Sequence, residues 1–407
     1  MTRPEGAACR GAGKLVAVAL LAMFAVPGSW AEKMPSDDLS RRLLELRRRE
    51  VGRHAPLPEA ESAELAAIGR VYLLRGDEAR AIELLEESVA RNPGSDAALG
   101  WLILAYVRHG DFEFGRSYLE IATSRELAAA PEPAVYREIG ERFSAANFLD
   151  AAAVAWGLYR RAGGDDALLL ARLDRTRREL AASPGQRSIA NDAFTIYGDE
   201  AISADELARI ERDLAAEYER QTSLFGSGLG KPPVVVLHAG RRYFSLVSIP
   251  DWVSGVFDGK IRISLDAARG FGPEVATVLS HELAHAFIRE ISGGRAPGWL
   301  HEGLAQWCSG RRIPRAEFRR ELAGVRPRTI DEMEGALVVS FDPGPARAQY
   351  AESLGLVEYL AARRGEGAVF CLVRDLGAGE DLARALRREC GLSTEQLVAG
   401  WRAWAGI

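Results

Sequence analysis

The segment at positions 278–309 limits the possible folds of this chain more than any other part of the sequence. It reads VLSHELAHAFIREISGGRAPGWLHEGLAQWCS, with His281, Glu282 and His285 in a His-Glu-x-x-His motif and Glu302 after it. On a helix, residues four positions apart lie one turn apart on one face, so both imidazoles can reach a single metal ion. Glu282 projects beside them, where a carboxylate can accept a proton from a metal-bound water.

Two neighbouring helices are expected to carry these residues. Apolar residues recur at helical spacing from Val275 to Ile291, and Pro273 suits a first helical turn. Glycines and a proline then interrupt the pattern, and a second helix is expected at about 297–308. The short connector makes the helices neighbours, which can bring Glu302 over the histidine pair. Two imidazoles, one carboxylate and a water form the open four-coordinate arrangement of a catalytic zinc.

Other arrangements of the segment lead to different ligand sets. A third histidine further along the first helix is excluded, because Ile288 and Ile291 stand where that pattern needs glycine and histidine. His301 is a rival third ligand, but it points roughly 100° away from Glu302 around the helix. A histidine on the surface or beside a ligand is the simpler interpretation of His301. A buried helix pair that happens to contain the motif is the alternative for the whole segment.

The stretches HELAH and GWLHEGLA resemble the gluzincin metallopeptidases, in particular the bacterial peptidase MA-like group related to thermolysin and aminopeptidase N. The resemblance implies a zincin-type, thermolysin-like α+β domain, here at 191–407. It implies one zinc ion held by His281, His285 and Glu302, with Glu282 as general base. The interval between His285 and Glu302 is shorter than in the aminopeptidases, so no long insertion separates the two helices.

Tyr350 is a second candidate catalytic residue. It lies near the start of an expected helix that continues through Leu354 and Leu360. In gluzincins a tyrosine or histidine of a later helix donates a hydrogen bond to the tetrahedral intermediate, and the resemblance implies this role for Tyr350. A tyrosine that covers the core with its hydroxyl outside is an equal alternative.

An expected hairpin supplies the candidate substrate-binding residues. Positions 252–257 and 260–265 alternate like strands around an Asp-Gly turn. Ile261 and Ile263 are expected to face the core, with Arg262 and Ser264 outward. The resemblance implies that this hairpin is an edge that pairs with an extended peptide, as in strand addition, and an ordinary hairpin is the alternative. The candidates are Gly255, Ile261, Arg262 and Ile263.

The remaining elements of 191–407 complete a mixed α+β unit. Strands are expected at about 193–197 and 233–238, with a helix at about 203–222 between them. His238 ends a strand and is interpreted as a turn or packing residue. Ser393 and Gln396 predict a capping box for a last helix that ends near Trp404.

The first 31 residues have the pattern of a signal peptide. Basic residues precede an apolar run at 15–26, and Ser29 and Ala31 offer small side chains to a signal peptidase. The run is too short to span a bilayer comfortably. We expect a periplasmic or secreted protein with no membrane span in the mature chain, and an uncleaved anchor is the alternative.

A repeat occupies about residues 39–182. Small and large residues recur at an interval of about 34 residues, with Ile68, Tyr72 and Leu85 matched by Leu102, Tyr106 and Leu119 and more loosely by Ile139, Phe143 and Trp156. The pattern resembles tetratricopeptide repeats, which implies an all-α solenoid that binds a peptide or protein partner, or merely stabilises the enzyme. A capping helix is expected at about 165–180, and residues 183–190 are expected to be a linker.

Composition narrows the function classes. A net charge of -5 without a basic stripe argues against nucleic acid as the target. After the leader, three cysteines remain, of which Cys371 and Cys390 could pair, whereas Cys308 is expected to be a small buried residue. The expected function is an exported zinc-dependent peptidase, with endopeptidase action favoured over aminopeptidase action. The alternative is an interaction or scaffold protein with an inactive or structural zincin domain.

Overall fold

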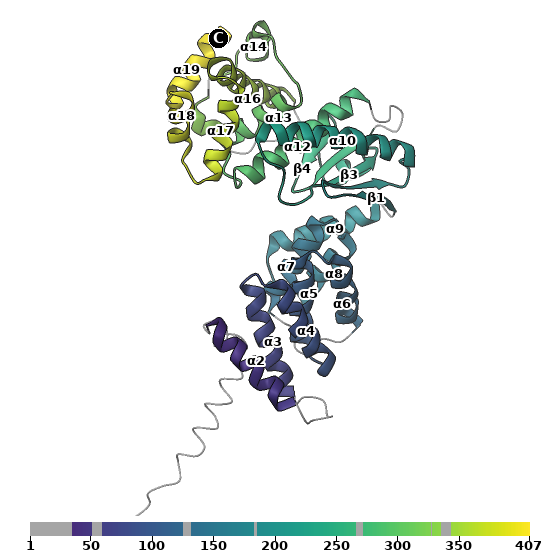
Figure 1. The fold of residues 1–407 in the computed structure, drawn as a ribbon. Helices are drawn as coiled ribbons and strands as arrows, with labels where there is room; N and C mark the ends of the chain where they lie inside the picture. Colours follow the sequence, from purple (N-terminus) through teal and green to yellow (C-terminus); the bar gives the residue numbers. More distant parts are fainter. Residues whose placement is uncertain are drawn as a thin grey trace, which may run out of the picture. The chain divides into compact units, whose positions relative to one another are not determined.

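The computed structural model describes residues 35–50, 59–124, 132–182, 185–265, 272–326, 328–334 and 343–407. This part of the chain is mostly helical and contains one small mixed sheet, so the protein is α+β with a large helical part (Figure 1). It divides into two compact units, Met1–Thr176 and Arg177–Ile407. The expected signal peptide, 1–31, lies outside the described residues. Among the helices that are described, none is both long and apolar enough to cross a membrane.

Helices of the first unit pack in consecutive pairs. These are α3 (Glu59–Leu74) with α4 (Glu78–Arg91), α5 (Asp96–His109) with α6 (Phe112–Ser124), and α7 (Pro133–Ala145) with α8 (Leu149–Arg161). Before them α2 (Ser36–Glu50) packs on α3, and after them comes α9 (Ala167–Ala182).

Glycines allow the paired helices to cross closely. A β-carbon added at Gly69 would lie 2.9 Å from Cγ of Leu85, and one added at Gly115 would lie 2.8 Å from Cγ1 of Val107. At Gly140 it would collide with the fully buried indole of Trp156. The small and large residues that recur in the sequence therefore meet at helix crossings.

The predicted linker at 183–190 is wrong over most of its length. Residues Gln186–Ala190 form strand β1, which pairs antiparallel with β2 (Thr195–Asp199). The side chains of β1 are exposed or half-buried, so this edge strand lacks the apolar alternation by which a strand is recognised. The division between the two units lies earlier, within α9.

The sheet of the second unit has the order β1-β2-β3-β5-β4. β3 (Val234–Ala239) lies between β2 and β5 (Ile261–Leu265) and runs parallel to both. β4 (Gly255–Phe257) pairs antiparallel with β5 and forms the edge. The predicted hairpin is confirmed, and Gly259 in its turn has φ of 101°, a conformation that glycine adopts readily.

Helix α12 (Pro273–Ile291) connects the sheet to the helical remainder of this unit. It packs on β4, β5 and α10 (Ala204–Phe225), and its Leu283 and Phe287 share one core with Val235 of β3. The other helices are α11 (Arg242–Leu246), α13 (Gly298–Cys308), α14 (Arg315–Glu321), α15 (Ile330–Glu334), α16 (Pro343–Arg364), α17 (Glu366–Gly377), α18 (Leu382–Cys390) and α19 (Thr394–Ala405). The predicted capping box of Ser393 and Gln396 is present at the start of α19.

The prediction that Arg262 and Ser264 face outward is wrong. All five residues of β5 are buried, and Arg262 is only 3% exposed. Its guanidinium pairs with Glu179 of α9 and lies 4.7 Å from the centre of the Tyr243 ring. Both faces of β5 are therefore covered. An alternating pattern assigns polar residues to the solvent face, so it gives a wrong prediction when those polar residues are buried by another element.

Candidate metal centre

Helix α12 presents His281 and His285 on one face. The two imidazole centroids lie 4.6 Å apart, and their Nε2 atoms are separated by 3.1 Å. Leu279, Leu283 and Phe287 anchor the opposite side of this helix in the core. Burial of the apolar stripe therefore sets the rotation of α12 and directs both Nε2 atoms to one point.

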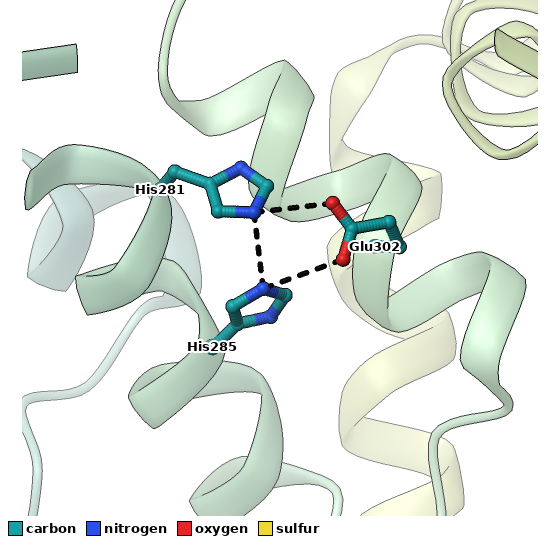
Figure 2. A group of neighbouring side chains, drawn as sticks. All are labelled: His281, His285 and Glu302. Atoms are coloured by element: carbon teal, nitrogen blue, oxygen red, sulfur yellow. Dashed lines mark hydrogen bonds and ion pairs between the residues drawn. The ribbon is translucent and has the colours of Figure 1, made fainter. Parts of the chain in front are cut away.

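Glu302 reaches this point from α13. Its Oε1 lies 3.1 Å from Nε2 of His281, and its Oε2 lies 3.5 Å from Nε2 of His285 (Figure 2). Ligand atoms of the three residues all lie within 4.8 Å of one another. Two imidazole nitrogens and one carboxylate are a donor set that suits zinc and leaves one tetrahedral position open.

Glu282 lies beside this group in a buried position. It is 6% exposed, and burial is the main cause that raises the pKa of its carboxyl above the usual range. The negative charge of Glu302 acts in the same direction, while the two histidines oppose it. A carboxyl with a raised pKa is better matched to proton transfer near neutral pH than an ordinary glutamate.

The pKa of the Glu302 carboxyl is shifted in the direction opposite to that of Glu282. Burial would raise its pKa, but His281 and His285 outweigh that effect and hold the pKa well below the usual range. Glu302 therefore remains an anion, whereas Glu282 can take up a proton. Two buried carboxyls at one site thus have distinct protonation behaviour, which is a common property of catalytic sites.

Helix α16 crosses α13 at Gly303, next to Glu302. A β-carbon on Gly303 would collide with the backbone carbonyl of Ser353, so only glycine fits there. The side chain of Gln306 donates a hydrogen bond of 3.0 Å to the carbonyl of Tyr350. Gly303 therefore permits the close approach of α16 to α13.

This crossing brings Tyr350 to the site. Burial raises the pKa of its hydroxyl, and the negative charges of Glu302 and Glu282 raise it further. Its ring packs edge-on against Trp252, with centroids 6.3 Å apart. The hydroxyl of Tyr350 is therefore protonated at neutral pH and available as a hydrogen-bond donor.

The candidate substrate-binding residues fall into two groups. Gly255 lies on β4 directly against α12, since a β-carbon there would be 2.5 Å from Cγ1 of Val278 and 2.8 Å from Oε1 of Glu282. Ile261, Arg262 and Ile263 lie on β5, whose backbone is paired on both sides by β3 and β4. Among the described strands, β4 is the edge of the sheet on this side, so the three β5 residues are not on the edge.

His301 lies outside the group of three ligands but contacts one of them. Its Nδ1 is 2.7 Å from Nδ1 of His285, on the side of that ring away from Nε2. Burial is the main cause that lowers the pKa of His301 to about 3. Of the two positions expected for His301, the structure therefore shows the one beside a candidate ligand and not the surface position.

A polar network on α10 was also missed by the sequence analysis. The carboxylate of Glu217 accepts hydrogen bonds from Gln221 at 2.6 Å and from Ser280, beside His281, at 2.8 Å. Arg220 pairs with Glu217 and donates to the backbone carbonyl of Cys308 at the end of α13. This network joins both ligand-bearing helices to a third helix.

The remaining candidates behave as packing residues. His238 is 1% exposed, and its ring stacks on Tyr243 with centroids 4.3 Å apart, as expected for a packing histidine. Cys308 is buried, and burial raises its pKa to about 12. Of the cysteines in the described part of the chain, Cys308, Cys371 and Cys390 are free thiols, so the structure shows no bond between Cys371 and Cys390.

Comparisons with known proteins do not assign the chain to a family. A scan against models of protein families finds no match, and a search of curated proteins finds none either.

Proposed function

We propose that this protein is a zinc-dependent peptidase whose metal ion is held by His281, His285 and Glu302. The observation that carries the proposal is the convergence of two Nε2 atoms and one carboxylate within 4.8 Å, with Glu282 buried beside them. A zinc ion bound there would lower the pKa of a water to about 7 and polarise a carbonyl group. The His-Glu-x-x-His sequence and the later glutamate support a gluzincin-type site of the peptidase MA-like group.

Glu282 and Tyr350 are assigned the proton chemistry. Glu282 accepts a proton from the attacking water and returns it to the departing amine, which its raised pKa favours. The protonated hydroxyl of Tyr350 donates a hydrogen bond to the carbonyl oxygen, where negative charge develops. Glu302 stays ionised and provides the negative charge that a divalent cation requires.

The substrate is proposed to be a peptide or protein bound in extended form along β4. Among the described strands β4 is an edge that can pair with a peptide backbone, and Gly255 brings this edge close to Glu282 because it has no side chain. Endopeptidase action is favoured over aminopeptidase action. We propose that the reaction takes place in the periplasm or outside the cell, as the N-terminal sequence suggests.

The paired helices α3–α8 are proposed to be a tetratricopeptide-like solenoid that recruits a protein partner or the substrate. Close crossings at Gly69, Gly115 and Gly140 support this proposal. The second candidate function rests on this unit: an interaction protein whose zincin-type domain is inactive or structural. The presence of Glu282 favours the enzyme, because a general base is not needed to bind metal.

Replacement of Glu282 by Gln tests the proposed function. We expect the wild-type protein to contain one zinc per chain and to cleave peptides in a casein or peptide-library assay. The Glu282→Gln variant should keep the zinc and lose at least about 100-fold in rate, because proton transfer contributes that much. Glu274→Gln, an exposed change on the same helix, is the matched control and should retain activity. Zinc without hydrolysis in the wild type would favour the interaction protein, and absence of zinc would overturn the metal centre.

A further inference from the structure

We propose that His301 is a positioning residue that fixes the proton of His285 on Nδ1 and thereby keeps Nε2 of His285 free to bind the metal ion. This inference rests on the proposed metal centre and extends it by one residue. It concerns affinity for the ion and is independent of which bond the enzyme cleaves.

The contact has the geometry of a hydrogen bond in the plane of both rings. The two Nδ1 atoms lie 2.7 Å apart, while the ring centroids lie 4.7 Å apart and the planes differ by 24°. For a nitrogen–nitrogen distance of 2.7 Å, the ring centroids are farthest apart when both nitrogens lie on the line between them, and the observed 4.7 Å is close to that limit. The two nitrogens therefore point at each other along their lone-pair and N–H directions.

One arrangement of protons satisfies both the contact and a bound metal. Nε2 of His285 faces Nε2 of His281 and the carboxylate of Glu302, so it must carry a lone pair to act as a ligand. A neutral His285 then has its proton on Nδ1 and donates it to Nδ1 of His301. His301 accepts at Nδ1 and carries its own proton on Nε2. A hydrogen bond at the second ring nitrogen commonly sets the tautomer of a metal-bound histidine.

The alternative is that His301 merely fills space between α12 and α13. The two roles make different demands on the side chain. Positioning requires a hydrogen-bond acceptor at the place of Nδ1, whereas packing requires only volume. Asparagine can present its amide oxygen near that place, and leucine has a similar branch without an acceptor.

We therefore compare His301→Asn with His301→Leu, using His109→Leu, a change at an exposed histidine, as control. The dissociation constant for Zn²⁺ is measured by competition with a chelator at fixed pH, and thermal unfolding is recorded for each metal-free protein. His301→Leu should weaken zinc binding about 10- to 100-fold, the usual effect of losing such a partner. His301→Asn should remain within about threefold of wild type, and the metal-free unfolding temperatures should be similar.

Two results would overturn the role of His301 and leave the metal centre intact. One is zinc affinity in His301→Leu within about twofold of wild type. The other is equal weakening in the Asn and Leu variants, which would show that a hydrogen-bond acceptor at this position does not maintain zinc affinity. Failure of the wild type to bind zinc would instead overturn the proposed metal centre, and the role of His301 with it.

Discussion

Glu282 is placed at the site by residues next to it in the sequence, whereas Tyr350 is placed there by the packing of distant elements. Glu282 lies between the two histidines of one helix, so its position relative to them is set by helical geometry. Tyr350 reaches the same site only because α16 crosses α13 at Gly303. At the scale of single residues, local helix geometry therefore determines the position of Glu282, and helix packing determines that of Tyr350.

Replacement of Tyr350 by Phe should lower kcat about 100-fold, because one hydrogen bond to the developing oxyanion is lost. Zinc content should be unchanged, since Tyr350 is not among the three ligands. Steady-state kinetics and metal analysis of the purified variant measure both. Tyr359→Phe, on the same helix but packed against Trp404, is the control and should keep its activity. An unaltered kcat in Tyr350→Phe would remove this residue from the mechanism.

His238 should make the protein less stable in mild acid. Burial, followed by the charges of Arg262 and Lys260, lowers its pKa to about 3. The unfolded chain binds a proton at this residue near pH 6.5, so the free energy of unfolding falls as the pH drops below that value. Between pH 7 and pH 5 the loss should be about 2 kcal/mol.

The variant His238→Phe keeps an aromatic ring beside Tyr243 and removes the titrating group. Urea unfolding at pH 7 and pH 5 should show a smaller loss for this variant than for wild type. The exposed change His109→Phe provides the comparison. The same loss in His238→Phe as in wild type would show that another group causes the acid sensitivity.

At the scale of elements, three helices hold the site together. α12 and α13 carry the candidate ligands, and α10 joins the two helices through Glu217, Gln221 and Arg220. Burial would raise the pKa of Glu217, but hydrogen bonds from Arg220, Gln221 and Ser280 outweigh it and lower that pKa. Its stabilising contribution is therefore present above the unfolded-state pKa, about 4.3, and is lost as the pH falls through the folded-state value.

Replacement of Glu217 by Gln should reduce the free energy of unfolding at pH 7 by about 1–3 kcal/mol, because buried donors lose a charged acceptor. Glu219→Gln, an exposed change two residues away, should have an effect below about 0.5 kcal/mol. Urea unfolding of the two variants and the wild type measures both values. Equal stability of the Glu217 and Glu219 variants would show that the network contributes nothing.

At the scale of the whole molecule, α9 contributes to the second unit through its last turn. Glu179 and Arg262 are 3% exposed each, and they form a buried ion pair between α9 and β5. A fragment that begins after α9 would leave the guanidinium of Arg262 buried with Asp258 as its remaining carboxylate neighbour. Removal of one member of a buried pair is strongly destabilising.

A fragment of residues 167–407 should therefore be more stable than one of residues 185–407. Within the longer fragment, Glu179→Gln should reproduce much of the difference, about 3 kcal/mol. Thermal and urea unfolding of the three proteins test this expectation. Equal stability of the longer fragment and its Glu179→Gln form would mean that α9 acts without the ion pair.

The elements around the site were predictable where their signals are local. The helix at 273–291, the hairpin at 258–259 and the capping box at Ser393 each depend on residues within a few positions of one another. β1 was taken for a linker because an exposed edge strand has no apolar alternation. Strand alternation predicts an outward Arg262, and the sequence gives no sign of its buried partner Glu179, which is distant along the chain.

The sequence by itself determined which side chains could form the candidate metal centre, because helical spacing places His281, Glu282 and His285 together. The tertiary structure decided which contacts surround them. The approach of Tyr350 across Gly303, the contact of His301 with His285 and the edge position of Gly255 all arise between elements distant along the chain. Local backbone geometry repeats with a fixed period and can be read from residue spacing, whereas the crossing of two helices depends on the volumes of side chains from both.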